Sequence, residues 1–123
     1  MADRSLVVLS VEDDLDTQEM LAMLLGEQGY GFEAVGTCAD AMRLLREREI
    51  ALVLLDNWLP DGTGVELCKQ VRAFDKRLPI IFVSGSAHDN ERFEALKSGA
   101  NAFLTKPVAF NEFFAILKDY APL

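Results

Sequence analysis

Short apolar runs recur along the chain and limit most strongly what it can fold into. The clearest cover residues 6–11, 51–55, 80–83 and 102–104, and a weaker one covers residues 32–35. Each run is short and almost wholly apolar, which is typical of strands buried on both faces. Such strands belong to parallel sheets that helices cover on both sides.

The segments between these runs have the spacing of amphipathic helices. Apolar residues recur at intervals of three and four around Leu21, Met42, Cys68, Phe93 and Phe113. Glycines and prolines fall between the predicted elements. The alternation therefore predicts five βα units and a doubly wound α/β sandwich with a five-stranded parallel sheet and right-handed crossovers.

Size, composition and charge narrow the function. The 123 residues, half of them hydrophobic, suffice for one core, and with no linker or repeat we expect residues 1–123 to form a single domain with no second domain among them. No apolar stretch has the length of a membrane span and no targeting segment is found, so we expect no membrane association and a cytoplasmic location. A formal net charge of -8 disfavours direct binding to nucleic acid.

Polar residues follow most of the predicted strands. In open parallel sheets, ligands bind beyond the carboxyl ends of the strands. The run at 32–35 is followed by Gly36 and Thr37, which offer no candidate site residue. This places its strand at an edge, as in the order 2-1-3-4-5 of the flavodoxin-like topology. The other four runs are followed by candidate site residues: Glu12, Asp13, Asp56, Ser84 and Lys106.

These residue types point to metal-assisted phosphoryl chemistry. Carboxylates held close together repel one another unless a cation neutralises them, and oxygen donors without His or Cys favour Mg²⁺. Glu12, Asp13 and Asp56 are therefore predicted to hold Mg²⁺. A carboxylate such as that of Asp56 can also attack phosphorus, with Lys106 and Ser84 contacting the phosphoryl oxygens.

Each candidate also has a plain structural explanation. Asp13 or Asp14 could cap a helix, Asp56 could begin a turn, Lys106 could be a solvated charge, and Ser84 could simply end a strand. Their coincidence at one edge of a sheet favours a site.

The motifs resemble the receiver domain of two-component response regulators over residues 6–120. In that family the closing motif carries a switch aromatic, here Phe103, and a lysine, here Lys106. Four segments carry the resemblance, namely the acidic pair after the first strand, the phosphoacceptor segment, the switch-hydroxyl strand and the closing motif, at residues 6–14, 54–62, 81–85 and 98–107.

The resemblance implies that Asp56 accepts a phosphoryl group from a histidine kinase or a histidine phosphotransfer protein. It implies Mg²⁺ bound by Glu12, Asp13, Asp56 and the carbonyl of Trp58, and a cis peptide bond before Pro107. Such a domain assists its own phosphorylation and dephosphorylation and is not otherwise an enzyme.

The resemblance also implies a switch. Ser84 would move toward the phosphoryl group and Phe103 would turn inward, changing the surface formed by the fourth helix, fifth strand and fifth helix. The resemblance identifies neither the downstream protein or output domain nor the cognate kinase. It also leaves open a homodimer through the fourth and fifth helices. The chain could be a stand-alone receiver, a fragment, or part of a hybrid kinase.

Rival functions lack one or more required residues. A phosphatase of the haloacid dehalogenase type needs a second Asp two residues after the nucleophile, where this chain has Trp58. A flavodoxin-like cofactor protein would find its phosphate repelled by Glu12 and Asp13, and no glycine-rich nucleotide loop is present. The remaining alternative is an interaction module that keeps the receiver fold without using phosphate.

Overall fold

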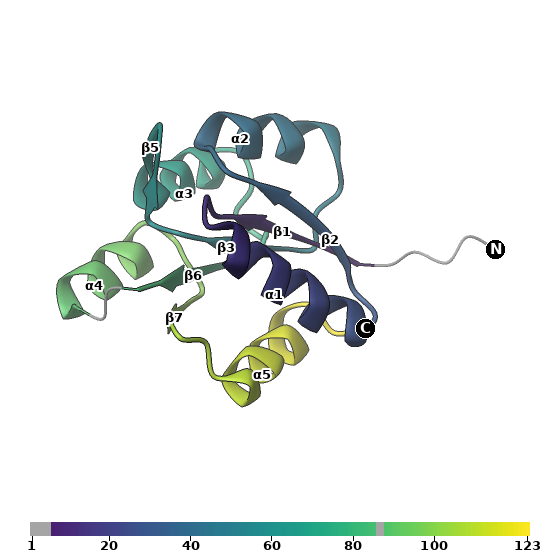
Figure 1. Cartoon of the computed structure of the whole chain (residues 1–123). Coiled ribbons are helices and arrows are strands. Elements are labelled where there is room, and N and C mark those ends of the chain that lie inside the picture. The colour runs from purple at the N-terminus through teal and green to yellow at the C-terminus, as the bar shows by residue number, and fades with distance from the viewer. Residues whose placement is uncertain (1–5, 86–87) are drawn as a thin grey trace.

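A parallel sheet between two layers of helices forms the centre of the computed structural model, which describes residues 6–85 and 88–123 (Figure 1). None of the helices in these residues is long and apolar enough to cross a membrane. The elements in chain order are β1 (Val7–Val11), α1 (Leu15–Glu27), β2 (Gly31–Val35), α2 (Cys38–Glu47), β3 (Leu52–Leu55), β4 (Trp58–Leu59), β5 (Gly62–Thr63), α3 (Gly64–Arg72), β6 (Ile80–Ser84), α4 (Asp89–Lys97), β7 (Ala102–Thr105) and α5 (Phe110–Tyr120).

The order of the strands confirms the predicted topology. Within the described residues the main sheet has five strands in the order β2-β1-β3-β6-β7, so β6 and β7 are the predicted fourth and fifth strands. All neighbours are parallel, and Val11 at the end of β1 lies beside both Val35 and Leu55. The carboxyl ends of the strands therefore meet at one edge of the sheet.

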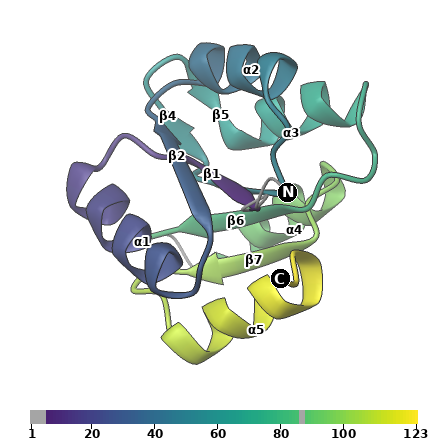
Figure 2. The ribbon, with the colours of Figure 1, turned by 90° about the vertical axis from the view of Figure 1, so that its right-hand side faces the viewer.

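Both faces of the central strands are buried, which explains why these strands are almost wholly apolar. Leu9 of β1 points into a core shared with α2, α3 and α4, and its neighbour Val8 points into a core shared with α1 and α5. Figure 2 shows these two helical layers on opposite sides of the sheet. A strand with an apolar layer on each face leaves little room for polar side chains until the strand ends.

A short antiparallel hairpin, β4–β5, follows β3 and was expected only as a turn. Trp58 pairs with Thr63, and Leu59 pairs with Gly62. Asp61 at its tip accepts hydrogen bonds from the backbone N–H groups of Cys38 and Ala39, at 2.8 and 3.0 Å. These bonds lower the pKa of Asp61 and tie the hairpin to the first turn of α2.

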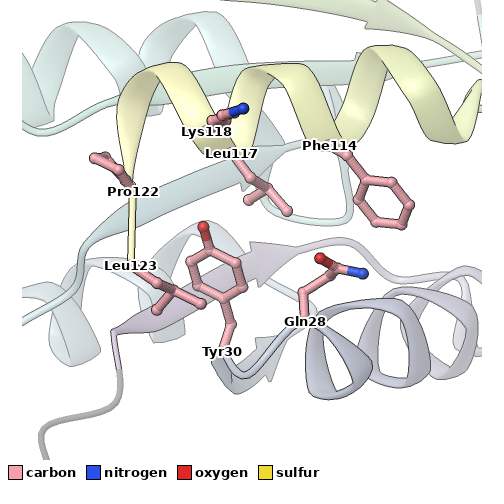
Figure 3. A pocket seen from close by; sticks show the side chains of 7 residues that line it. All are labelled: Gln28, Tyr30, Phe114, Leu117, Lys118, Pro122 and Leu123. Carbon is pink, nitrogen blue, oxygen red and sulfur yellow. The ribbon is translucent and has the colours of Figure 1, made fainter.

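An apolar hollow of about 320 Å³ lies between the ends of α1 and α5 (Figure 3). The hydroxyl of Tyr30 donates to the carbonyl of Ala121 at 2.6 Å beside it. Because α1 runs back from the carboxyl end of β1, its last turn lies at the opposite edge of the sheet from the polar residues. The hollow is therefore separate from the candidate site.

Candidate functional site

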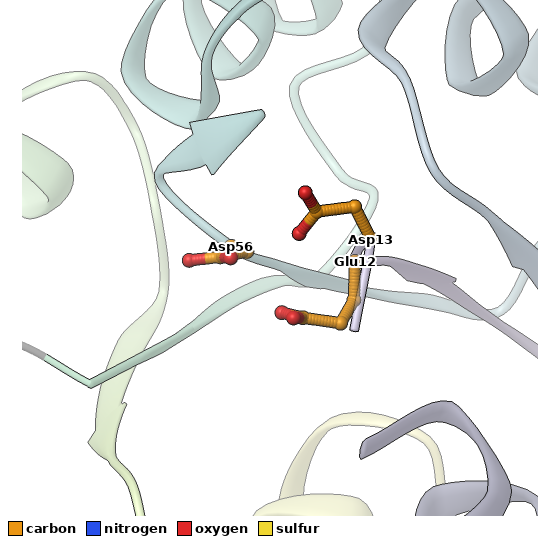
Figure 4. A group of neighbouring side chains, drawn as sticks. All are labelled: Glu12, Asp13 and Asp56. Atoms are coloured by element: carbon orange, nitrogen blue, oxygen red, sulfur yellow. The ribbon is translucent and has the colours of Figure 1, made fainter. Parts of the chain in front are cut away.

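Three carboxylates converge where β1 and β3 end. Glu12 and Asp13 follow β1 and Asp56 follows β3; one oxygen of each lies within 4.8 Å of the others, and Figure 4 shows the three side chains gathered together. The pairing of Val11 with Leu55 explains this proximity, because it sets the residues that follow the two strands side by side.

Glu12 is the most buried member and has two partners. Its side chain is 6% exposed. Lys106 Nζ lies 2.9 Å from Glu12 Oε2, and the backbone N–H of Asp14 donates to Glu12 Oε1 at 3.1 Å. Lys106 reaches the cluster from the loop after β7, where its own backbone N–H donates to the carbonyl of Ser84 at 2.8 Å. The lysine thus offsets one of the three negative charges.

The environment of the cluster changes the pKa of Asp56. Burial, followed by the hydrogen bond and the charge of Glu12, raises the pKa of Asp56 from 3.8 to about 6, although nearby Lys106 acts in the opposite direction. The cluster therefore carries more negative charge than its own lysine compensates. A divalent cation with a preference for oxygen ligands would relieve that excess, so the donor set fits Mg²⁺.

The backbone behind Asp56 is held by residues that the sequence reasoning missed. Asn57 is 8% exposed, and its Oδ1 accepts from the N–H of Val65 at 3.1 Å. The N–H of Gly64 donates to the carbonyl of Asn57 at 2.8 Å. The N–H of Trp58 points to Asp56 Oδ1 at 3.5 Å, while the Trp58 side chain is 59% exposed. The hairpin therefore presents the indole ring to solvent two residues after Asp56.

Ser84 and Phe103 lie on the neighbouring strands β6 and β7. Ser84 ends β6, is 1% exposed, and lies beside Thr105. Phe103 is 8% exposed and stacks on Phe82 with ring centroids 6.2 Å apart. The ring of Phe103 is therefore already turned inward, whereas the resemblance implied that it turns inward on phosphorylation.

The loop after β7 also lies at the edge of the sheet where the carboxylates gather. The peptide bond between Lys106 and Pro107 is cis. The guanidinium of Arg92 on α4 lies 5.2 Å from the centroid of the Phe103 ring. Arg92 was not anticipated from the sequence, since nothing in the spacing of α4 connects it with a ring on β7.

Replacing Arg92 should loosen Phe103. We expect Arg92→Ala to lower the free energy of unfolding by about 0.5–1 kcal/mol, because an exposed cation–π contact contributes that much. Chemical denaturation of Arg92→Ala, Phe103→Leu and the double variant measures the coupling between the two side chains. Arg46→Ala, an exposed arginine on α2, is the control. A coupling energy of zero would contradict the contact.

Comparison with known proteins agrees with the topology. A profile of the response regulator receiver domain family matches residues 8–118. The transcriptional regulatory protein GltR of Pseudomonas aeruginosa is 34% identical over 113 residues, which cover 90% of this chain and 47% of the regulator. The chain thus spans about half the length of this curated relative.

Solved structures give the same result. A two-component response regulator from Clostridium difficile superposes with a TM-score of 0.90 at 27% identity, covering 94% of this chain and 95% of the other. The receiver domain of a sensor histidine kinase from Pseudomonas aeruginosa, with a magnesium ion coordinated in its active site cleft, gives 0.87 at 28% identity, covering 95% and 98%. The chain therefore belongs to the response regulator receiver domain family of two-component systems.

Proposed function

We propose that the chain is the phosphoacceptor switch of a two-component system and that it takes a phosphoryl group onto Asp56. The donor would be a histidine kinase or a histidine phosphotransfer protein. The observation that carries the proposal is the convergence of Glu12, Asp13 and Asp56 within 4.8 Å, beside the ammonium of Lys106. An acceptor carboxylate, a cation-binding pair and a fixed positive charge are the groups that phosphoryl transfer to a carboxylate requires.

Mg²⁺ is the proposed cofactor. Glu12, Asp13 and Asp56 would hold it through carboxylate oxygens, and the carbonyl of Trp58 is the fourth proposed protein ligand. When bound, the ion would neutralise the carboxylates and the negative charge on the phosphoryl oxygens.

The residues of the chain perform the transfer by position and charge. A carboxylate oxygen of Asp56 attacks phosphorus while the P–N bond to the donor imidazole breaks, and that electron pair returns to the imidazole nitrogen. Lys106 would exchange its contact with Glu12 for one with a phosphoryl oxygen, and the Ser84 hydroxyl would donate to another. The domain thus assists its own phosphorylation and is not an enzyme toward other molecules.

The proposed readout runs through Ser84 and Phe103 to the surface of α4, β7 and α5. Because Phe103 already lies inward at 8% exposure, we expect phosphorylation to stabilise this position rather than to create it. The partner would be a downstream protein or output domain in the cytoplasm, or a second copy bound through α4 and α5. That residues 1–123 form one receiver domain with no output domain stays a prediction.

Incubation with Mg²⁺ and acetyl phosphate, followed by intact-mass measurement, tests the proposal. We expect a mass increase of one phosphoryl group in the wild type and in Asp119→Asn, an exposed aspartate on α5, and no increase in Asp56→Asn. Chelation of the metal should prevent the adduct. An unmodified wild-type chain would favour the phosphate-independent interaction module, and an adduct that survives in Asp56→Asn would place the acceptor elsewhere.

A further inference from the structure

Gln18 on α1 is a buried polar residue with an unusual set of partners. Its side chain is 8% exposed. Its Nε2 donates to the carbonyl of Glu12 at 2.8 Å, and lies 3.3 Å from the carbonyls of Ser10 and Val35. These carbonyls belong to the end of β1, the end of β2 and the first acidic residue of the site. One amide group thus joins α1 to the two strands at the edge where the carboxylates gather.

The contacts indicate that this position needs hydrogen-bond donors. Three carbonyl oxygens share the two N–H bonds of one amide, and the carbonyl of Glu12 has the shortest contact. In the part of the chain that the structure describes, Gln18 Oε1 is buried without a partner. A buried acceptor without a donor costs free energy, so Gln18 occupies this position at a cost that an apolar side chain would avoid. Its benefit must come from the donors.

The donors of Gln18 act on the peptide that carries both acidic residues. The carbonyl of Glu12 belongs to the peptide unit that links Glu12 to Asp13, so a bond to this oxygen restricts rotation of the whole unit. The N–H of Glu12 is anchored as well, by the carbonyl of Val35 at 2.9 Å. With its backbone fixed on both sides, Glu12 keeps its carboxylate directed toward Lys106 and the cluster.

We propose that Gln18 is a positioning residue, which orients the Glu12–Asp13 peptide and thereby sets the affinity of the cluster for Mg²⁺. The inference rests on the proposed function, since it concerns the same cation site. Gln18 touches neither the cation nor the phosphoryl group and acts through Glu12. A purely structural role would lower stability and leave the affinity for the cation unchanged.

Calorimetric titration of the full chain with Mg²⁺ alone distinguishes the two roles. Gln18→Met preserves length and burial and removes both donors. We expect its Kd for Mg²⁺ to rise about tenfold, the lower end of the range found when a group that orients a metal ligand is removed. With saturating Mg²⁺, phosphorylation by acetyl phosphate should return to within about twofold of the wild-type rate, because only binding has been weakened.

Gln70→Met on α3 is the matched control, since Gln70 is exposed and lies outside the cluster. It should bind Mg²⁺ like the wild type. If Gln18→Met does not fold, Gln18→Asn, which keeps the amide on a side chain one methylene shorter, should weaken binding in the same direction.

A folded Gln18 variant with the wild-type Kd would overturn the inference, even if it melted at a lower temperature. Equal weakening in Gln70→Met would overturn it too. A wild-type chain that binds no Mg²⁺ would instead contradict the proposed function, so the two failures are distinguishable.

Discussion

Gly64→Ala should lower the free energy of unfolding by about 3 kcal/mol, the upper end of the usual cost of overpacking a core. A Cβ at this position would lie 2.5 Å from the carbonyl oxygen of Asp56, 2.9 Å from Phe82 Cε2 and 3.0 Å from Asn57 Cα. Two of these atoms belong to backbone, and Phe82 is fully buried, so none can move away cheaply. Relief of the clash requires displacement of the Asp56 backbone.

Gly26→Ala is the matched control for that substitution. Gly26 lies near the end of α1, and a Cβ there would meet nothing within 4 Å. Alanine is the better helix former by up to about 1 kcal/mol, so this variant should be as stable as the wild type or more stable. Urea denaturation measures both variants. Equal stability of Gly64→Ala and the wild type would contradict the predicted clash.

The sequence was sufficient to predict the sheet because consecutive residues of a strand face two separate apolar cores, one on each side of the sheet. Val8 and Leu9 are neighbours that point into different cores, and such a pair produces a continuous apolar run rather than an alternating one. The order of the strands followed from chemistry rather than periodicity. Only the strand that ends at Val35 is followed by no candidate site residue, and the structure places it at the edge.

The hairpin could not be predicted, because strands of two residues are too short to show a period. Its attachment depends on Asp61 reaching the N–H groups of Cys38 and Ala39, more than 20 residues earlier in the chain. Contacts of this range follow from the assembled sheet and leave no local signal. The same is true of Arg92 over Phe103.

Gln18 differs, because a signal was present. It lies three residues before Leu21 and seven before Leu25, so it shares the buried face of α1 with them. A polar residue in an apolar helical stripe predicts a buried hydrogen-bonded group. The sequence could not identify the hydrogen-bond partners of Gln18, because one of them, the carbonyl of Val35, belongs to a separate strand that only the folded sheet brings close.

Lys106 shows a second limit, which concerns charge rather than fold. The sequence reasoning assigned its ammonium to phosphoryl oxygens, and the structure pairs it with Glu12 at 2.9 Å. Without a phosphoryl group, the nearest uncompensated negative charge is a carboxylate. The partner of the Lys106 ammonium therefore depends on whether a phosphoryl group is bound, and the sequence alone does not specify that state.

Partial burial of Asp56, together with the nearby charge of Glu12, makes the metal-free protein sensitive to pH, and Asp56→Asn should remove that sensitivity. The folded-state pKa of Asp56 is raised from 3.8 to about 6. The folded chain therefore binds this proton more tightly than the unfolded chain. The resulting stabilisation is complete below pH 3.8 and is lost as pH rises through about 6. Above that range the ionised carboxylate destabilises the fold, mainly because it is partly buried and secondarily because it lies beside Glu12.

Near neutral pH and with a chelator present, Asp56→Asn should therefore be more stable than the wild type by about 1–2 kcal/mol. The full shift would correspond to about 3 kcal/mol, and solvent screening of a partly exposed carboxylate reduces it. Denaturation at a series of pH values measures the difference, which should vanish at acidic pH. Added Mg²⁺ should stabilise the wild type more than the variant and so reverse their order.

Asp61→Asn provides a comparison of opposite sign. Hydrogen bonds from Cys38 and Ala39 lower the pKa of Asp61, so its contribution to stability is present above 3.8 and is lost as pH falls through the lowered value. This variant should be less stable than the wild type at neutral pH and should approach it in acid. Parallel pH profiles for the wild type and Asp56→Asn would show that the pKa of Asp56 is not raised in the folded chain, and the electrostatic reason for a cation at this site would then fail.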